Sequence, residues 1–125
     1  MFSTEQHNIL SLIAATIFAD KRVYESEIEV FGKATAKLKV LQETKPKHSE
    51  AEILVWYEMN KDDIRQKITT PYFKDWLYDL LEQLSYIQDK QSILDIMQKI
   101  SLADGNVHVS ERALTTLAKR YWGII

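Results

Sequence analysis

Two stretches near opposite ends of the chain share one pattern, and this pattern decides the predicted fold. Residues 12–27 read LIAATIFADKRVYESE, and residues 96–111 read IMQKISLADGNVHVSE. Both carry an apolar stretch, then Ala-Asp, a Val three residues after the Asp, and a closing Ser-Glu. The pattern predicts that each stretch ends one helix, makes a tight turn and starts another helix.

Each shared residue has a physical reason to stand where it does. The Ala allows two helices to approach closely, and the Asp that follows it can bond to backbone groups in the turn. The Val fills the corner between the helices. The Glu falls at about the third position of the next helix, where its carboxylate meets free backbone N–H groups and a favourable helix dipole. The repeat predicts a pseudo-twofold domain with units at about 9–38 and 93–122, in which the two acidic corners lie near each other.

The remainder of the chain also favours helices. Hydrophobic residues make up 46% of the 125, and there are only three Gly and two Pro. That composition suits one domain with a substantial core and argues against an all-β fold rich in tight turns. Periodicity, capping residues and a Thr-Pro start signal predict helices over residues 4–19, 25–41, 50–60, 64–68, 71–86, 90–104 and 109–121. We therefore expect a single all-α domain over residues 1–125, a compact bundle of about seven helices without β-strands.

Three local predictions accompany this outline. Ser3 with Gln6, and Ser49 with Glu52, have the spacing of capping boxes that open a helix. The first helix should turn Ile9, Leu12, Ile13 and Ile17 inward and keep His7, Ser11 and Thr16 on a polar opposite face. Gly32, inside the second helix, costs about 1 kcal/mol relative to Ala and suggests that a neighbouring helix approaches closely there.

Charge and composition exclude several classes of function. The 16 Lys and Arg against 18 Asp and Glu give a net charge of −2, which does not suit a general nucleic-acid binder. The absence of Cys excludes disulfides, Cys-ligated zinc and thiol catalysis. The first residues lack the features of a signal peptide, and no apolar stretch approaches the ~20 residues of a membrane span. We expect a soluble, cytoplasmic domain with no phosphate loop and no dinucleotide fingerprint.

The two corners resemble those of a known family. The pattern Ala-Asp-Gly-x-Val-x-x-x-Glu, which residues 103–111 match and residues 19–27 match in part, resembles the TerB-like domains of tellurite-resistance proteins. Related domains stand at the front of some membrane-anchored DnaJ-type cochaperones. The resemblance covers nearly the whole chain and implies an all-α fold of about seven helices. It implies no enzymatic reaction and links the chain to a bacterial chemical-stress response near the inner membrane.

The resemblance also implies an acidic cluster that binds metal ions. Here the ligands would be Asp20, Glu27, Asp104 and Glu111, and the cofactor a divalent cation, Ca²⁺ or Mg²⁺, which prefers oxygen ligands. An EF-hand is excluded, because the segment between Asp104 and Glu111 is too short for its loop. Lys21 and Arg22 stand beside Asp20, and their positive charges would weaken a cation site at that corner.

Several alternatives to a metal site remain open at this stage. The four acids can simply cap helices and fix turns in a structural or adaptor domain. A pocket among the aromatic residues would instead support a small hydrolase or ligand-binding bundle. His108 could add a ligand at the second corner, but the three His residues have no zinc-binding spacing. A protein partner could bind an apolar anchor at Trp122, and peripheral contact with anionic lipid could use the Lys residues at 33, 37, 39, 45 and 47.

Overall fold

The computed structural model describes residues 2–19, 25–43, 47–103 and 109–124. Within these residues it contains seven helices and no β-strand, as predicted for an all-α fold. The helices are α1 (Thr4–Phe18), α2 (Glu25–Ala36), α3 (Lys39–Glu43), α4 (Glu50–Thr69), α5 (Phe73–Gln83), α6 (Lys90–Ser101) and α7 (Val109–Trp122).

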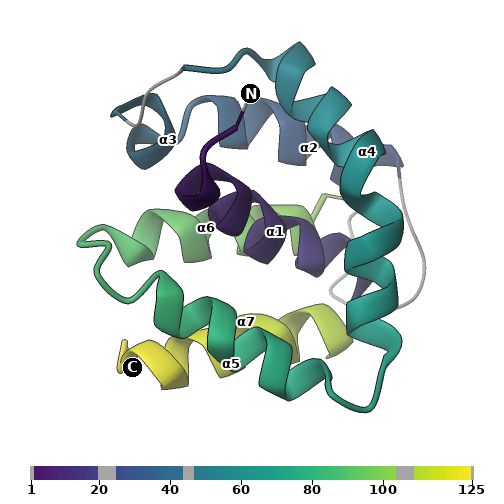
Figure 1. Ribbon diagram of the computed structural model, residues 1–125, viewed down its shortest axis with the longest axis vertical. Coiled ribbons are helices and arrows are strands. Elements are labelled where there is room, and N and C mark those ends of the chain that lie inside the picture. The colour runs from purple at the N-terminus through teal and green to yellow at the C-terminus, as the bar shows by residue number, and fades with distance from the viewer. Residues whose placement is uncertain (1, 20–24, 44–46, 104–108, 125) are drawn as a thin grey trace.

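Helix α1 lies at the centre of the bundle (Figure 1). It contacts α2, α4, α5, α6 and α7, so other helices surround it. Every residue from Ile9 to Phe18 is buried, including Ser11 and Thr16. The predicted polar face of this helix is therefore wrong in its central part. The Ser11 hydroxyl is accommodated by donating a hydrogen bond to the His7 carbonyl oxygen at 2.7 Å.

The predicted second helix is divided into α2 and α3. It ends at Ala36 instead of running to Leu41, and α3 starts at Lys39. Tertiary packing explains the break, because Leu38 and Leu41 are both buried in the core. The side chain of Gln42 supports the turn by donating from Nε2 to the Ala36 carbonyl at 3.0 Å.

The predicted third and fourth helices are instead one helix, α4. It continues through the acidic segment at Asp62 and Asp63, where we expected a break. Continuation places Ile64 two turns after Tyr57, and both side chains are buried. The two Asp side chains are exposed to solvent, so their charges cost the helix little stability. The count of seven helices is thus correct, although one predicted helix splits and two others merge.

Other helix boundaries differ by a few residues. Thr70 does not cap α5; it ends α4 and donates from Oγ1 to the Lys67 carbonyl at 2.9 Å. Helix α5 begins at Phe73 without a side-chain cap and ends at Gln83, short of the predicted end. Helix α6 is capped by Asp89, whose side chain accepts from the Ser92 N–H, and it ends at Ser101, short of the predicted end.

Both predicted capping boxes are present. Ser3 Oγ accepts from the Gln6 backbone N–H at 3.1 Å, and the Gln6 side chain accepts from the Ser3 N–H. Ser49 and Glu52 make the same pair of bonds at the start of α4.

At Gly32, helix α2 lies close to α4. A Cβ atom at this position would lie 2.9 Å from Leu54 Cδ2 and 3.1 Å from Leu54 Cγ. The predicted close approach is therefore confirmed.

Candidate functional site

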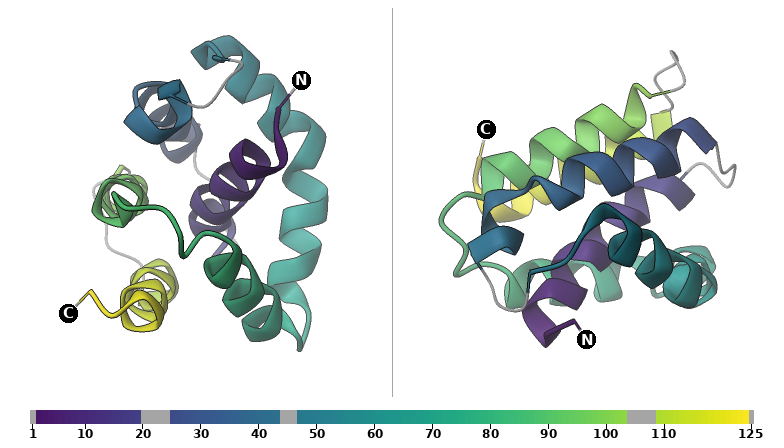
Figure 2. Two further views of the ribbon diagram at one scale, coloured as in Figure 1. Left: turned by 60° about the vertical axis from the view of Figure 1, so that its left-hand side comes forward. Right: turned by 90° about the horizontal axis from the view of Figure 1, so that it is seen from above.

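The described helix ends that flank the two repeat turns lie on one side of the molecule. Helix α1 packs against α6, and Figures 1 and 2 show both helices ending on the same side. Helices α2 and α7 begin on that side too. All four helix ends that flank the repeat turns thus lie on the right of Figure 1. We call this part of the described structure the corner end.

Three of the four predicted acids lie wholly or in part outside the described residues. Asp20 and Asp104 lie outside the described residues. Glu111 belongs to α7 by its backbone, and its side chain lies outside the described part of the structure. His108, the additional ligand considered from the sequence, also lies outside the described residues. Among the residues that the structure describes, no three His, Asp or Glu side chains gather as a metal-binding group.

Glu27 is the one predicted ligand whose surroundings are visible. It is the third residue of α2, as predicted, and its exposed fraction is 0%. Removing an ionised carboxylate from water is costly unless hydrogen bonds or a cation balance its charge. Its field reaches Tyr57, whose pKa rises to about 12, chiefly because of burial and to a smaller extent because of nearby carboxylates including Glu27. An acid so deep in the structure has a structural or ligand-binding role and not a role in solubility.

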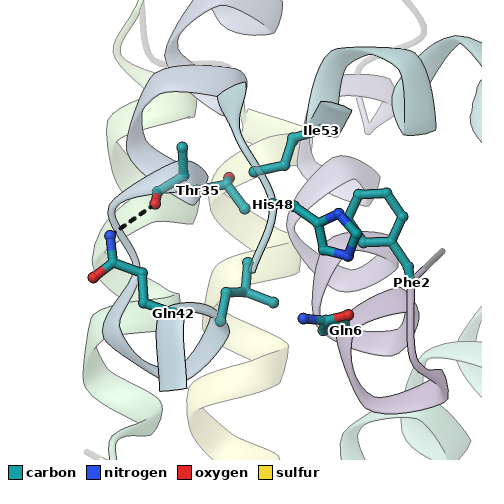
Figure 3. Close-up of a pocket in the computed structure, with 8 residues that line it drawn as sticks. Phe2, Gln6, Thr35, Gln42, His48 and Ile53 are labelled. Atoms are coloured by element: carbon teal, nitrogen blue, oxygen red, sulfur yellow. Dashed lines mark hydrogen bonds between the residues drawn. The ribbon is translucent and has the colours of Figure 1, made fainter. Parts of the chain in front are cut away.

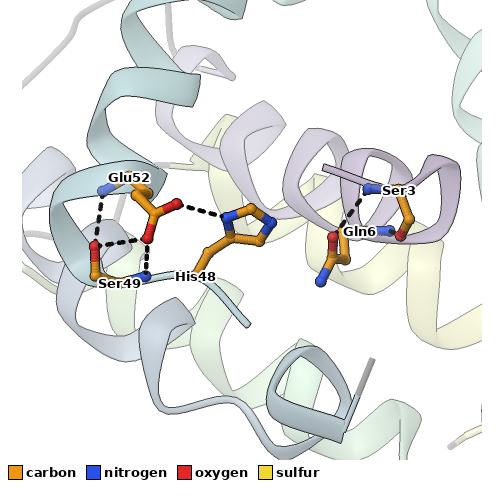
Figure 4. Close-up of polar contacts among 5 residues, drawn as sticks. All are labelled: Ser3, Gln6, His48, Ser49 and Glu52. Atoms are coloured by element: carbon orange, nitrogen blue, oxygen red, sulfur yellow. Dashed lines mark hydrogen bonds and ion pairs between the residues drawn. The ribbon is translucent and has the colours of Figure 1, made fainter. Parts of the chain in front are cut away.

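A second polar cluster joins the N-terminus to the start of α4 (Figure 4). His48 Nδ1 lies 3.0 Å from Glu52 Oε2, and the His48 ring stacks on Phe2 with centroids 3.7 Å apart. The hydrogen bond from the Ser49 backbone N–H is the main cause of the lowered pKa of Glu52. The hydrogen bond to His48 lowers this pKa further. This cluster fastens residues 2–6 to the start of α4.

Behind the cluster lies a small cavity (Figure 3). It is lined by Phe2, Gln6, Thr35, Ala36, Leu41, Gln42, His48 and Ile53. Its volume is about 10 Å³, which is roughly the space of one water molecule. It cannot hold a substrate, so it gives no support to the hydrolase or ligand-pocket alternative.

An open apolar groove runs along the other side of the same cluster. Its volume is about 620 Å³, and most of its lining surface is apolar. The lining residues are Phe2, His7, His48, Ala51, Glu52, Val55, Trp56, Met59 and Asn60. Val55 and Met59 are 58% and 80% exposed. We call this surface the α4 groove.

His7 links the groove to the core. Trp56 Nε1 donates to His7 Nδ1 at 3.1 Å, which fixes the neutral ring with its proton on Nε2. Burial lowers the pKa of His7; nearby Asp63 opposes this and Lys67 adds to it. Sequence analysis did not identify the groove, although the apolar pair Val55 and Met59, one turn apart in a charged helix, was a visible signal.

Comparison with known proteins gives one family. The sequence model described as tellurite resistance protein TerB matches residues 6–124. The chain belongs to the TerB family. No curated protein and no solved structure matches the chain. Family membership confirms the resemblance found in the two corners and agrees with the all-helical fold of this TerB domain.

The structure describes the residues of two sequence-based alternatives for partner contacts in this TerB domain. Trp122 is partly buried and donates from Nε1 to the Leu81 carbonyl at 3.0 Å, so it is a packing residue and not an exposed anchor. Of the Lys residues considered for lipid contact, Lys33 pairs with Glu29 and Lys39 with Glu43 at the exposed surface. Lys37 and Lys47 are exposed, and Lys45 lies outside the described residues. Lipid contact stays a prediction. No described helix is long and apolar enough to cross a membrane.

Proposed function

We propose that this TerB domain is a non-enzymatic module that binds a divalent cation, Ca²⁺ or Mg²⁺, at its corner end. The ligands would be Asp20, Glu27, Asp104 and Glu111, and the loaded end would bind a protein partner. The observation that carries the proposal is the packing of α1 on α6 with both helices ending on the same side. Each of these helices is followed by one Asp of the repeat.

The burial of Glu27 supports the same proposal. Ca²⁺ is a hard cation that takes about six to eight oxygen ligands, and carboxylates from several segments of a chain can supply them. Glu27 provides a carboxylate that is shielded from water, where the attraction between opposite charges is stronger. Cation binding would then stabilise the end of the fold that the two corners build.

A calorimetric and thermal-melting titration with Ca²⁺, Mg²⁺ and Zn²⁺ tests the metal part. At an ion concentration 100 times Kd, binding stabilises the fold by about 2.7 kcal/mol, which raises Tm by roughly 10 °C for a domain of this size. Asp104→Asn should abolish the increase, whereas Asp95→Asn, at an exposed position of α6, should preserve it. Absence of heat and of a melting shift at millimolar ion would rule out the cation.

A structural or adaptor domain is the second candidate, and the position of Glu27 favours it. The third residue of a helix is the place where a Glu or Gln side chain caps free backbone N–H groups. Glu27→Gln separates the two candidates because Gln keeps a capping side chain but removes the charge. A capping role predicts a small loss of stability and no ion effect in either protein; a cation role predicts an ion-dependent Tm in the native chain alone.

We further infer a cytoplasmic role in a bacterial response to chemical stress, on the strength of the family description as tellurite resistance. A strain that lacks the gene should grow less well than its parent on tellurite, and Asp104→Asn should fail to restore growth. Normal growth of the deletion strain would contradict this role and leave the cation titration unaffected.

A further inference from the structure

The α4 groove has the composition of a protein-docking surface. Val55 and Met59 are exposed and stand one helical turn apart, with Ala51 one turn before them. On a monomeric surface, contiguous exposed apolar side chains in a hollow mark a binding site more often than scattered ones. Phe2 on His48 forms one wall, and the buried Trp56 forms the floor.

The rim of the groove is acidic. Glu52 lines it, and hydrogen bonds from Ser49 and His48 favour its ionised form. Asp62, one turn beyond the groove on α4, has no ion-pair partner among the described residues. No Lys or Arg is among the described residues that line the groove.

The neighbouring cations on α4 are already engaged. The Arg65 guanidinium lies over the Phe18 ring, 5.1 Å from its centroid, and two Lys side chains form ion pairs. Lys61 pairs with Glu58 at 2.7 Å, and Lys67 pairs with Asp63 at 3.9 Å. The groove thus presents an apolar stripe with the carboxylates of Glu52 and Asp62 beside it, and neither carboxylate pairs with a Lys or Arg among the described residues. A partner surface complementary to the groove would carry an apolar stripe flanked by Lys or Arg.

We propose that the α4 groove binds an amphipathic helix of a partner protein, with apolar side chains one turn apart on Val55 and Met59 and with Lys or Arg beside Glu52 and Asp62. The described surface has no strand edge that could extend a partner strand, which favours recognition by side chains in a groove. Ala51 to Met59 spans roughly 12 Å of helix, enough to engage two to three turns of a partner helix.

A second copy of this chain is a poorer occupant. In a twofold dimer the same surface meets itself, so Glu52 and Asp62 would face like charges. The groove also lies beside His7, near the start of α1, whereas the proposed cation site follows the end of that helix. The docking proposal therefore does not rest on the cation proposal, and each can fail alone.

The test uses the full chain and a displayed library of 16-residue peptides. Their apolar positions are fixed at helical spacing, and their other positions are randomised among Lys, Glu, Ser and Ala. We expect the enriched peptides to be rich in Lys on both flanks of the apolar stripe. A library that yields no binder, or binders as rich in Glu as in Lys, overturns the proposal.

Methyl-labelled methionine locates the bound peptide. Met59 lies in the groove, while Met97 is fully buried in the core and serves as the internal control. An enriched peptide should shift the Met59 methyl signal and leave that of Met97 in place. A Met59 signal that shifts with protein concentration alone would identify a second copy as the occupant and contradict a partner helix.

Matched variants then divide the apolar and charged contributions. Met59→Lys and Val55→Lys should each weaken peptide binding by at least about tenfold, since each puts a cation in the apolar stripe. Glu52→Gln keeps the capping box, because Gln also serves at that position, and should weaken binding by about two- to fivefold. Tyr72→Lys, at a residue 72% exposed outside the groove, is the control and should change nothing. Unchanged affinity of Met59→Lys would exclude the groove.

Discussion

Helices α1 and α4 begin with the same kind of cap but differ in how deeply they are buried. Each opens with a Ser capping box, yet α1 is buried on all sides from Ile9 onward, whereas α4 buries only Ile53, Trp56, Tyr57 and Ile64 of its 20 residues. Their charges differ accordingly: Glu5 is the one acidic residue of α1, and no Lys or Arg lies in it. The comparison shows that a cap fixes where a helix starts, while the distribution of charge along it decides how deeply it can lie in the fold.

The largest expected effect tests the burial of α1 against the exposure of α4. Ile13→Ala removes a completely buried side chain and should lower the free energy of unfolding by about 3 kcal/mol. Val55→Ala, at a residue 58% exposed, should change it by less than about 0.5 kcal/mol. Urea denaturation measures both. Similar losses in the two variants would show that α4 is buried in solution, for example by self-association.

The inner side of α4 is tested at its contact with α2. Gly32→Leu would place a side chain where Leu54 already lies, and should cost about 2 kcal/mol. Leu54→Ala in the same chain should restore part of the lost stability, since it opens space for the new side chain. If the double variant is as unstable as the sum of both single changes, the two helices do not meet at these residues.

Loss of the caps should affect both helices alike. Ser3→Ala and Ser49→Ala each remove the acceptor for a backbone N–H and should cost about 1 kcal/mol. Thermal melting and circular dichroism measure the effect. A much smaller loss for one of them would mean that tertiary packing alone fixes the start of that helix.

The smallest effect concerns the contact between the two helices at His7. Burial lowers the pKa of this ring in the folded chain below the ordinary value of 6.5. Below pH 6.5 the unfolded chain therefore binds a proton that the folded chain does not, so stability falls as the pH drops from 6.5 toward the lower folded pKa. His7→Gln should flatten this part of the pH dependence. An unchanged slope between pH 7 and pH 5 would assign it to other groups.

Several boundaries were predictable because their causes are local. Ser3, Ser49 and Asp89 cap helices through bonds that span three residues, so sequence spacing is enough to find them. The errors occurred where distant packing overrode local signals. Burial of Leu38 accompanies the break in a predicted helix. Burial of Ile64 accompanies the continuation of α4 through an acidic segment.

The candidate site divides in the same way. The repeat identified Glu27 as the third residue of a helix, but its complete burial could not be read from the sequence. The α4 groove needed the structure, because Phe2 and His7 reach α4 across more than 40 residues of chain. The predicted ligands Asp20, Asp104 and Glu111 remain predictions.

By itself, the sequence determined the helical fold, the family and the repeated acidic corners, because periodicity, capping and motif spacing act over a few residues. Tertiary structure alone decided that α1 is the central helix, that the ends of α1 and α6 share one side, and that an apolar groove with an acidic rim stays open along α4. These features depend on which side chains meet after the chain has folded, and burial is a property of that whole arrangement.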